Sequence, residues 1–210
     1  MHRALTSVGL GIGLIALALQ LRLTIPARLD GGDSLLGAVV FFLSFFTILT
    51  NIGLVLVYTA ALAPRALPMW FGLPSSRAML AALILLVMAV YHFVLAENWA
   101  PVGWFHVADV MLHYLTPIFY LIWWVLAPRK DIIGFGAIPR MIVVPIVYVV
   151  YIFIRGAIVD EYPYPFLDLN QFGPMTVAMN ILVIVVLMTV LFLLAIIIEN
   201  TLVRLRDRSS

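Results

Sequence analysis

The chain has 210 residues, of which 65% are hydrophobic and 10% are charged, and its formal net charge is +2. A soluble domain usually carries about 25% charged residues to cover its surface, so this composition excludes an ordinary soluble protein and indicates a helix bundle in lipid. The small net charge gives no support for nucleic-acid binding, and the absence of cysteine excludes disulfides, thiolate metal sites and cysteine nucleophiles.

Six segments are long and apolar enough to cross the hydrocarbon layer, which takes roughly 20 helical residues. In chain order they cover residues 4–25, 35–62, 77–97, 105–127, 139–159 and 174–203. Each segment must be helical, because a backbone group without a hydrogen bond is costly in lipid. The sequence therefore predicts an all-α polytopic bundle of six transmembrane helices, forming a single domain over residues 1–210.

The first segment has a second interpretation. Arg3 followed by an apolar run resembles a signal peptide with a cleavage site at Ala16 and Ala18, and its removal would leave five helices. The apolar run continues beyond that site, however, and Gly9 and Gly13 have the spacing that allows membrane helices to pack closely. We therefore expect the first helix to be retained.

The distribution of Lys and Arg predicts the orientation, because these residues are enriched in cytoplasmic loops. If the six helices alternate in direction, nine of the 12 Lys and Arg residues fall on one side of the membrane. The nine are Arg3, Arg65, Arg77, Arg129, Lys130, Arg140, Arg204, Arg206 and Arg208, and the others are Arg22, Arg28 and Arg155. We therefore expect both termini in the cytoplasm.

Polar side chains inside the predicted helices are the candidates for function, because each has a cost in lipid that something must offset. The second and fourth helices each carry three such side chains at i, i+3 and i+7, which places them on one helix face. On the second helix they are Ser44, Thr47 and Asn51, with Thr50 beside them, and on the fourth helix they are His106, Asp109 and His113. Further polar residues are His92, Arg155 and Asn180, and the loop before the last helix adds Asp160, Glu161, Tyr164 and Asp168.

The depth of these groups follows from the helical rise. At about 1.5 Å per residue, Thr47 lies roughly 18 Å and His113 roughly 12 Å below the outer surface. The polar groups therefore gather in the outer half of the bundle. We expect a polar cavity open to the outer face, with Thr47 near its floor and His113 just above, lined also by Ser44, Thr50, His92, His106, Tyr164 and Asn180.

The same residues also suit purely structural roles. Thr47 has the option of a hydrogen bond to a carbonyl of its own helix, and Asn51 suits a hydrogen bond between helices. His113 follows Asp109 by one helical turn, so the two side chains suit a pair along the helix. Arg155 suits an ion pair with a nearby carboxylate that holds helices together, or a bond to an anionic head group.

The first chemistry that fits this cavity is nucleophilic catalysis. A hydroxyl attacks an ester when a base removes its proton, and histidine is the usual base near neutral pH, so Thr47 and His113 would form the pair. Asp109 would orient the imidazole, and Asn51 or Arg155 would stabilise the oxyanion. No G-x-S-x-G motif is present, which excludes an ordinary α/β-hydrolase.

Two other chemistries remain. His92, His106, Asp109 and His113 are acceptable ligands for zinc or non-haem iron, and two histidines on separate helices suit a haem. Ionisable groups in a membrane cavity also suit a transporter or proton relay. Against transport, the inner half of the predicted bundle lacks charged groups and the sequence contains no repeated half.

Three short motifs resemble those of a known family. Residues 46–51, FTILTN, resemble its aromatic-Thr-x-x-(Ser/Thr)-Asn pattern, and residues 112–117, LHYLTP, resemble its Leu-His-x-x-x-Pro segment. Residues 162–167, YPYPFL, resemble its Tyr-Pro-Phe-Leu signature. The order and spacing of the three, over the second to sixth helices, are similar to those of the androgen-induced membrane protein family, whose bacterial members are called Pr6Pr proteins.

The resemblance implies a multipass hydrolase that cleaves fatty-acid esters of hydroxy fatty acids with a threonine and a histidine on different helices. Carried over by motif, these residues are Thr47 and His113, with Thr50 as the competing nucleophile. The resemblance further implies the bacterial cytoplasmic membrane as location, membrane lipids or a fatty-acyl ester as the partner, and no metal or other cofactor. We therefore predict a lipid-ester hydrolase. The alternatives are a metal- or haem-binding membrane protein and a non-catalytic lipid-binding or transport protein.

Overall fold

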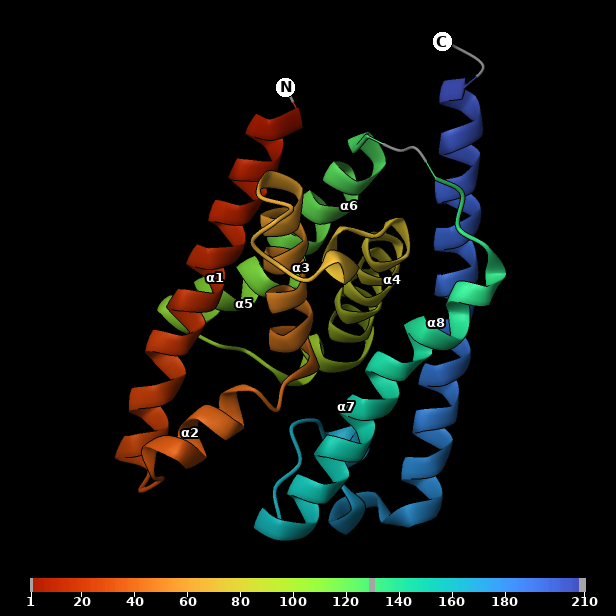
Figure 1. Cartoon of the computed structure of the whole chain (residues 1–210). Coiled ribbons are helices and arrows are strands. Elements are labelled where there is room, and N and C mark those ends of the chain that lie inside the picture. Colours follow the sequence, from red (N-terminus) through yellow and green to blue (C-terminus); the bar gives the residue numbers. More distant parts are fainter. Residues whose placement is uncertain (1, 129–130, 208–210) are drawn as a thin grey trace.

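A computed structural model describes residues 2–128 and 131–207 of the chain. Every regular element in these residues is a helix, which confirms the prediction of an all-α fold. Helix α1 begins, and helix α8 ends, at the same end of the bundle (Figure 1). Arg129, Lys130 and Arg208, on which the orientation prediction partly depends, lie outside the described residues.

Several of the helices are interrupted by turns of 3-10 or π helix. The fold is therefore described by segments that are long enough to cross a membrane. In the described residues, five segments are long and apolar enough to cross a membrane, and a bent pair of helices supplies a sixth candidate. These segments indicate an integral membrane protein. They are α1 (His2–Asp30), the pair α2 (Leu35–Phe42) and α3 (Phe46–Leu62), α4 (Pro74–Val90) with η2 (Tyr91–Leu95) and η3 (Ala96–Asn98), α5 (Trp104–Val110) with η4 (Met111–Leu115) and α6 (Thr116–Leu126), η5 (Phe135–Ala137) with α7 (Ile138–Val159), and α8 (Leu169–Asp207). Two short turns of 3-10 helix, η1 (Met69–Gly72) and η6 (Pro165–Leu167), lie in loops.

The predicted continuous helix over residues 35–62 is wrong, because α2 and α3 meet at an angle of 76°. Tyrosines of α7 satisfy the backbone carbonyls beside this break. The Tyr148 hydroxyl donates to the Ser44 carbonyl at 3.0 Å, and the Tyr151 hydroxyl donates to the Val40 carbonyl at 3.3 Å. A helix in lipid can be interrupted where neighbouring side chains satisfy the freed backbone groups. The break places Thr47 in the first turn of α3 instead of mid-helix.

Two other predicted boundaries also move. Helix α1 continues through Pro26 to Asp30, where a loop was expected. A proline so near a helix end removes one backbone bond and leaves few later turns to disturb. Helix α8 begins at Leu169 and contains a kink at Gly173, whose φ of 72° is a conformation that glycine adopts without strain.

Helices α1 and α3 pack closely against each other. A Cβ atom on Gly9 would lie 2.5 Å from the ring of Tyr58, and one on Gly13 would lie 2.8 Å from Val55, so only glycine allows this approach. Beside this contact, Trp123 of α6 packs edge-on against Tyr58 and donates from its indole nitrogen to the Thr6 hydroxyl at 2.9 Å. Small residues and buried hydrogen bonds are what hold helices together in lipid.

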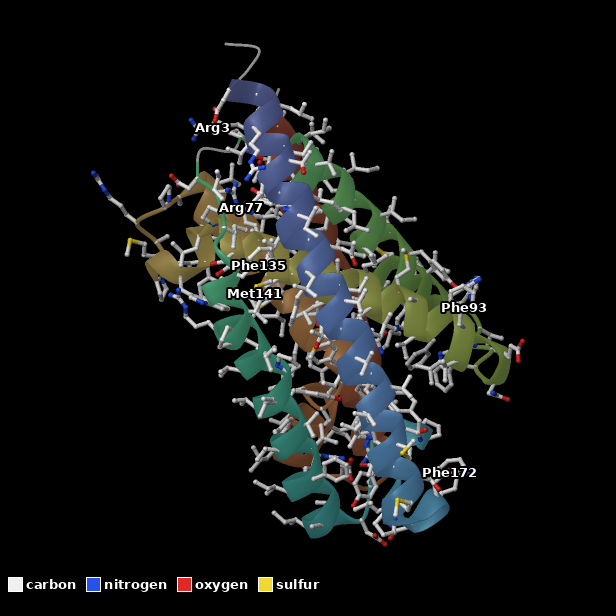
Figure 2. All side chains as sticks on the ribbon, turned by 90° about the vertical axis from the view of Figure 1, so that its right-hand side faces the viewer. Arg3, Arg77, Phe93, Phe135, Met141 and Phe172 are labelled. Carbon is white, nitrogen blue, oxygen red and sulfur yellow. The ribbon has the colours of Figure 1, made fainter. Side chains whose placement is uncertain are left out.

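Helix α8 extends along the whole bundle, and α7 lies beside its first half (Figure 1). In Figure 2, Arg3 and Arg77 lie near the end where α8 finishes, and Phe172 lies at the opposite end. The loop between α7 and α8 therefore caps the end of the bundle opposite to these arginines.

Candidate active site

The structure brings together two residues from different helices that the sequence singled out. The Thr47 Oγ1 atom of α3 lies 3.3 Å from the Nε2 atom of His113, which belongs to η4. The Thr47 residue is 7% exposed and the His113 side chain is 16% exposed, so the contact is largely, but not completely, buried. This distance is hydrogen-bond reach for a hydroxyl and a histidine base.

The other nitrogen of His113 is held by Asp109. His113 Nδ1 lies 3.0 Å from the Asp109 backbone oxygen and 3.1 Å from its Oδ1 carboxylate oxygen. Both partners accept hydrogen bonds only, so we assign the proton of a neutral imidazole to Nδ1. Nε2 is then the unprotonated nitrogen, and it accepts the hydrogen bond from the Thr47 hydroxyl.

Tyr91, which was not among the residues predicted from the sequence, completes the support of the imidazole. Its hydroxyl donates to the second carboxylate oxygen of Asp109, and its ring stacks on His113 at 3.8 Å between centroids and 11° between planes. A buried tyrosine hydroxyl needs a partner. Tyr91 beside His92 on an apolar helix was therefore a usable signal, but its partner on another helix was not visible in the sequence.

Both helices that carry this support contain a π-helical turn. Tyr91 begins the turn η2, and His113 lies in the middle of the turn η4. A π turn inserts one extra residue into a helix, widens it locally, and is found frequently at functional sites. Here the two widened turns face each other through the stacked rings of Tyr91 and His113.

Thr47 also lies at the start of a helix. This end of a helix carries a partial positive charge. The amide of Thr47 donates to the Tyr164 hydroxyl at 3.4 Å. Burial raises the pKa of the Tyr164 phenol, and hydrogen bonds with Thr47 and the amide of Phe46 lower it in part. The phenol is therefore protonated at neutral pH and has a proton to donate next to Thr47.

Asn51 is occupied by structural hydrogen bonds. Its amide nitrogen donates to the carbonyl of Thr47 at 2.8 Å and to the carbonyl of Leu112 at 3.3 Å, and its amide oxygen accepts from the Thr116 hydroxyl. These bonds tie α3 to the turn that carries His113. The suggestion that Asn51 stabilises an oxyanion therefore does not fit the structure, because both of its amide protons are already bonded.

Arg155 lies in a separate charged cluster. Its guanidinium donates to the carbonyl oxygen of Glu161 at 2.7 Å and also binds the Glu161 carboxylate. Arg28 binds the same carboxylate at 2.9 Å and also pairs with Asp33. The structure thus gives Arg155 an ion pair with a nearby carboxylate, that of Glu161. It gives no contact between Arg155 and Thr47, so an oxyanion role for Arg155 finds no support.

A cavity of about 300 Å³ begins at Thr47 and lies between α3, α4, α7 and α8. Apart from Thr47 and the tyrosines Tyr91, Tyr148 and Tyr164, its lining side chains are apolar. The expectation of a polar cavity is therefore wrong. Unpaired polar groups are costly in an apolar interior, and most of the polar side chains bond to other helices or to their own backbone instead.

Of the further residues predicted to line the cavity, only Tyr164 does so. Four of the others lie outside the lining of the cavity. The hydroxyl of the fifth, Thr50, is buried without a hydrogen-bond partner among the described residues. Ser44 donates to the Val40 carbonyl, His92 is exposed and pairs with the Tyr114 hydroxyl, His106 is exposed, and Asn180 donates to the Phe166 carbonyl. Thr50, the competing nucleophile, thus has no base beside it.

The metal alternative is weakened by where the histidines lie. Across residues 2–128 and 131–207, no three His, Asp or Glu side chains form a group suited to hold a metal ion. His113 already uses Nδ1 for Asp109 and Nε2 for Thr47.

Comparisons of the chain with protein-family models, with curated proteins and with solved structures find no match. The resemblance to androgen-induced membrane proteins stays a prediction. The interpretation of the site therefore depends on its geometry.

Proposed function

We propose that this protein is an intramembrane hydrolase of lipid esters, with Thr47 as nucleophile and His113 as general base. The observation that carries the proposal is the 3.3 Å contact between Thr47 Oγ1 and His113 Nε2, at the head of an apolar cavity. A hydroxyl, a base and a carboxylate that orients the base are the parts from which nucleophilic hydrolases are built.

The reaction follows from these parts. Thr47 Oγ1 attacks the acyl carbon and its proton moves to His113 Nε2, which gives a tetrahedral oxyanion. The ester C–O bond then breaks, His113 protonates the departing alkoxide, and the acyl group remains on Thr47. Water attacks the acyl-threonine while His113 takes its proton. Collapse releases the carboxylic acid and returns the proton to Thr47.

Charge on the oxyanion would be stabilised at the start of α3. The positive end of the helix and the protonated Tyr164 hydroxyl both lie at Thr47. Donors that are already oriented toward a developing charge lower the barrier without reorganisation, and each contributes about 10²–10³-fold in rate. Tyr164 would then have the role predicted for Asn51 or Arg155.

The substrate class follows from the cavity and the resemblance. An apolar cavity that opens from a nucleophile suits a fatty-acyl chain, and the family resemblance suggests fatty-acid esters of hydroxy fatty acids. The Lys and Arg bias and the common end of α1 and α8 support six crossings with cytoplasmic termini. The family resemblance suggests a bacterial cytoplasmic membrane. The site would then lie in the outer half of the bilayer.

The test is hydrolysis by purified protein of a fatty-acid ester of a hydroxy fatty acid, in lipid nanodiscs. We expect Thr47→Ala and His113→Ala each to lower the turnover rate by about 10³-fold or more, as losses of nucleophile or base do. Thr50→Ala is the matched control, since Thr50 is buried on the same helix without a base. The proposal fails if both site variants keep the parent's rate, or if Thr50→Ala abolishes turnover and Thr47→Ala does not.

A non-catalytic lipid-binding protein is the second candidate, and the apolar cavity itself favours it. Such a protein would retain the intact ester in the cavity. Mass spectrometry of protein incubated with substrate separates the two functions, because an acyl adduct on Thr47 requires catalysis, whereas intact bound ester and no released acid indicate binding alone.

A further inference from the structure

We infer that the cavity at Thr47 is an acyl-chain subsite that selects medium-length saturated chains of about eight to ten carbons. The inference rests on the proposed function and adds to it which part of the ester enters the bundle and how long that part is. It depends on the volume, depth, lining and opening of the cavity.

The volume sets the first limit. The cavity holds about 300 Å³. It lies at the small end of the range of ligand pockets, which run from about 300 to 1,000 Å³.

The depth gives an independent second limit. Tyr148 of α7 lies level with Thr47, since its ring packs against the neighbouring Phe46, and Ile142 lines the far end on the same helix. Six residues of helix separate Tyr148 from Ile142, which is about 9 Å. An extended polypeptide advances at most about 3.5 Å over three backbone bonds, so an extended acyl chain of about eight bonds fits this depth. Volume and depth therefore both favour a chain of limited length.

The lining determines which part of the ester enters. The hydroxyls of the lining tyrosines bond to Thr47, Ser44 and Asp109 near the Thr47 end, and apolar side chains such as Ile142, Leu86 and Met188 line the far end. A hydroxyl or carboxylate placed there would lose its hydration without gaining a partner, at a cost of several kcal/mol on apolar-transfer scales. The acyl carbonyl therefore lies at Thr47, its unsubstituted tail points inward, and the polar alcohol portion stays outside the cavity.

The opening determines how the chain arrives. Ile146 and Val150 of α7 and Val185 of α8 line the cavity and are still 54%, 52% and 38% exposed. A side chain that is both lining and exposed lies at the opening, so the cavity opens sideways between α7 and α8. Both helices are apolar enough to span the membrane. The chain therefore enters from the hydrocarbon layer. A chain of more than about ten carbons would reach the far end before its carbonyl lies at Thr47, so longer esters should react more slowly.

The experiment is a competition among saturated acyl esters of one hydroxy fatty acid. An equimolar mixture with acyl chains of about six to sixteen carbons is given to the protein in nanodiscs, and the released acids are quantified by mass spectrometry. We expect the highest specificity at about eight to ten carbons and a rate about tenfold lower at sixteen. A profile that is flat, or that rises steadily to sixteen carbons, would overturn the inference.

Two variants at the far end and one control make the test specific. Ile142→Phe shortens the cavity and should move the maximum to chains shorter by about two carbons, whereas Met188→Ala should move it to longer ones. Val143→Phe is the matched control, because Val143 is the next residue on α7, is 54% exposed and lies outside the lining. The inference fails if the two far-end variants keep the parent's profile, or if Val143→Phe changes the profile as Ile142→Phe does.

A binding measurement separates this inference from the proposed function. Equilibrium binding of radiolabelled saturated fatty acids of the same lengths to the Thr47→Ala variant needs no turnover. A maximum near eight to ten carbons with no hydrolysis by the parent would retain the subsite and reject the hydrolase. Hydrolysis without any preference for length, in rate or in binding, would retain the hydrolase and reject the subsite.

Discussion

The two sides of this bundle are packed in opposite ways. On the side of α1, α3 and α6, glycines bring backbones close together and Tyr58 and Trp123 are fully buried between them. On the side of α4, α7 and α8, the side chains leave a cavity of about 300 Å³. Lipid tails are as apolar as leucine, so no hydrophobic force closes such a gap from outside. Thr47 lies on the border, where the tight side fixes its position and the open side leaves room for a ligand.

This contrast assigns different tasks to the two sides. Precise positioning of reacting groups needs rigid support, and small errors in their geometry reduce rates strongly. Asn51 supplies part of that support, because its hydrogen bonds connect α3 to the turn of His113. The tight side should therefore control turnover and stability, and the open side should control which substrate is chosen.

The largest effect is expected from Asp109→Asn. The amide that replaces the carboxylate has a donor to offer His113 Nδ1, which favours the tautomer with the proton on Nε2 and removes the acceptor for the Thr47 hydroxyl. The same change beside a catalytic histidine costs about 10⁴-fold in turnover in a well-studied hydrolase, and we expect a loss of about 10²–10⁴-fold here. The measurement is the turnover rate in nanodiscs.

Its control is Asp131→Asn, an exposed carboxylate in the loop before α7. That variant should keep the parent's rate. An unchanged rate in Asp109→Asn, with His113→Ala inactive, would show that the carboxylate does not orient the base.

The next effect is expected from Tyr164→Phe. It removes the hydroxyl next to Thr47 and keeps the ring that lines the cavity, so turnover should fall by about 10- to 100-fold while the preferred chain length is unchanged. Tyr162→Phe is the control, because Tyr162 lies in the same loop and packs its ring against Gly156. Equal losses in the two variants would indicate a disturbed loop and contradict an oxyanion role.

Much of the fold was predictable because the bilayer fixes the length of its helices. The predicted helices over 105–127 and 139–159 agree closely with the segments Trp104–Leu126 and Ile138–Val159. The break between α2 and α3 was not predictable, since it depends on hydroxyls from α7 that are about a hundred residues away. Hydrophobicity shows where a chain is buried in lipid, but not which neighbour satisfies a backbone carbonyl.

The candidate site was predictable in part for a similar reason. Helical spacing and depth singled out Thr47, Asp109 and His113, since polar groups in lipid are few and costly. The predicted depths of Thr47 and His113 in the membrane differ by roughly 6 Å. The two side chains are nevertheless in contact, because the break and the π turn change the level of both residues. Tyr91 and the apolar cavity depend on contacts between helices, which one sequence does not reveal.

The smallest effect, and the most direct test of the tight side, compares two glycines of α1. A Cβ atom on Gly9 would lie 2.5 Å from the buried ring of Tyr58, whereas one on Gly11 meets nothing within 4 Å. Gly9→Ala should therefore cost about 1–3 kcal/mol of stability, the usual range for overpacking. Gly11→Ala should stabilise by about 0.5–1 kcal/mol, because alanine loses less conformational freedom in a helix. Thermal unfolding followed by tryptophan fluorescence measures both. If Gly9→Ala is as stable as Gly11→Ala, α1 and α3 are not held in close contact, and the proposed division between a tight and an open side loses its basis.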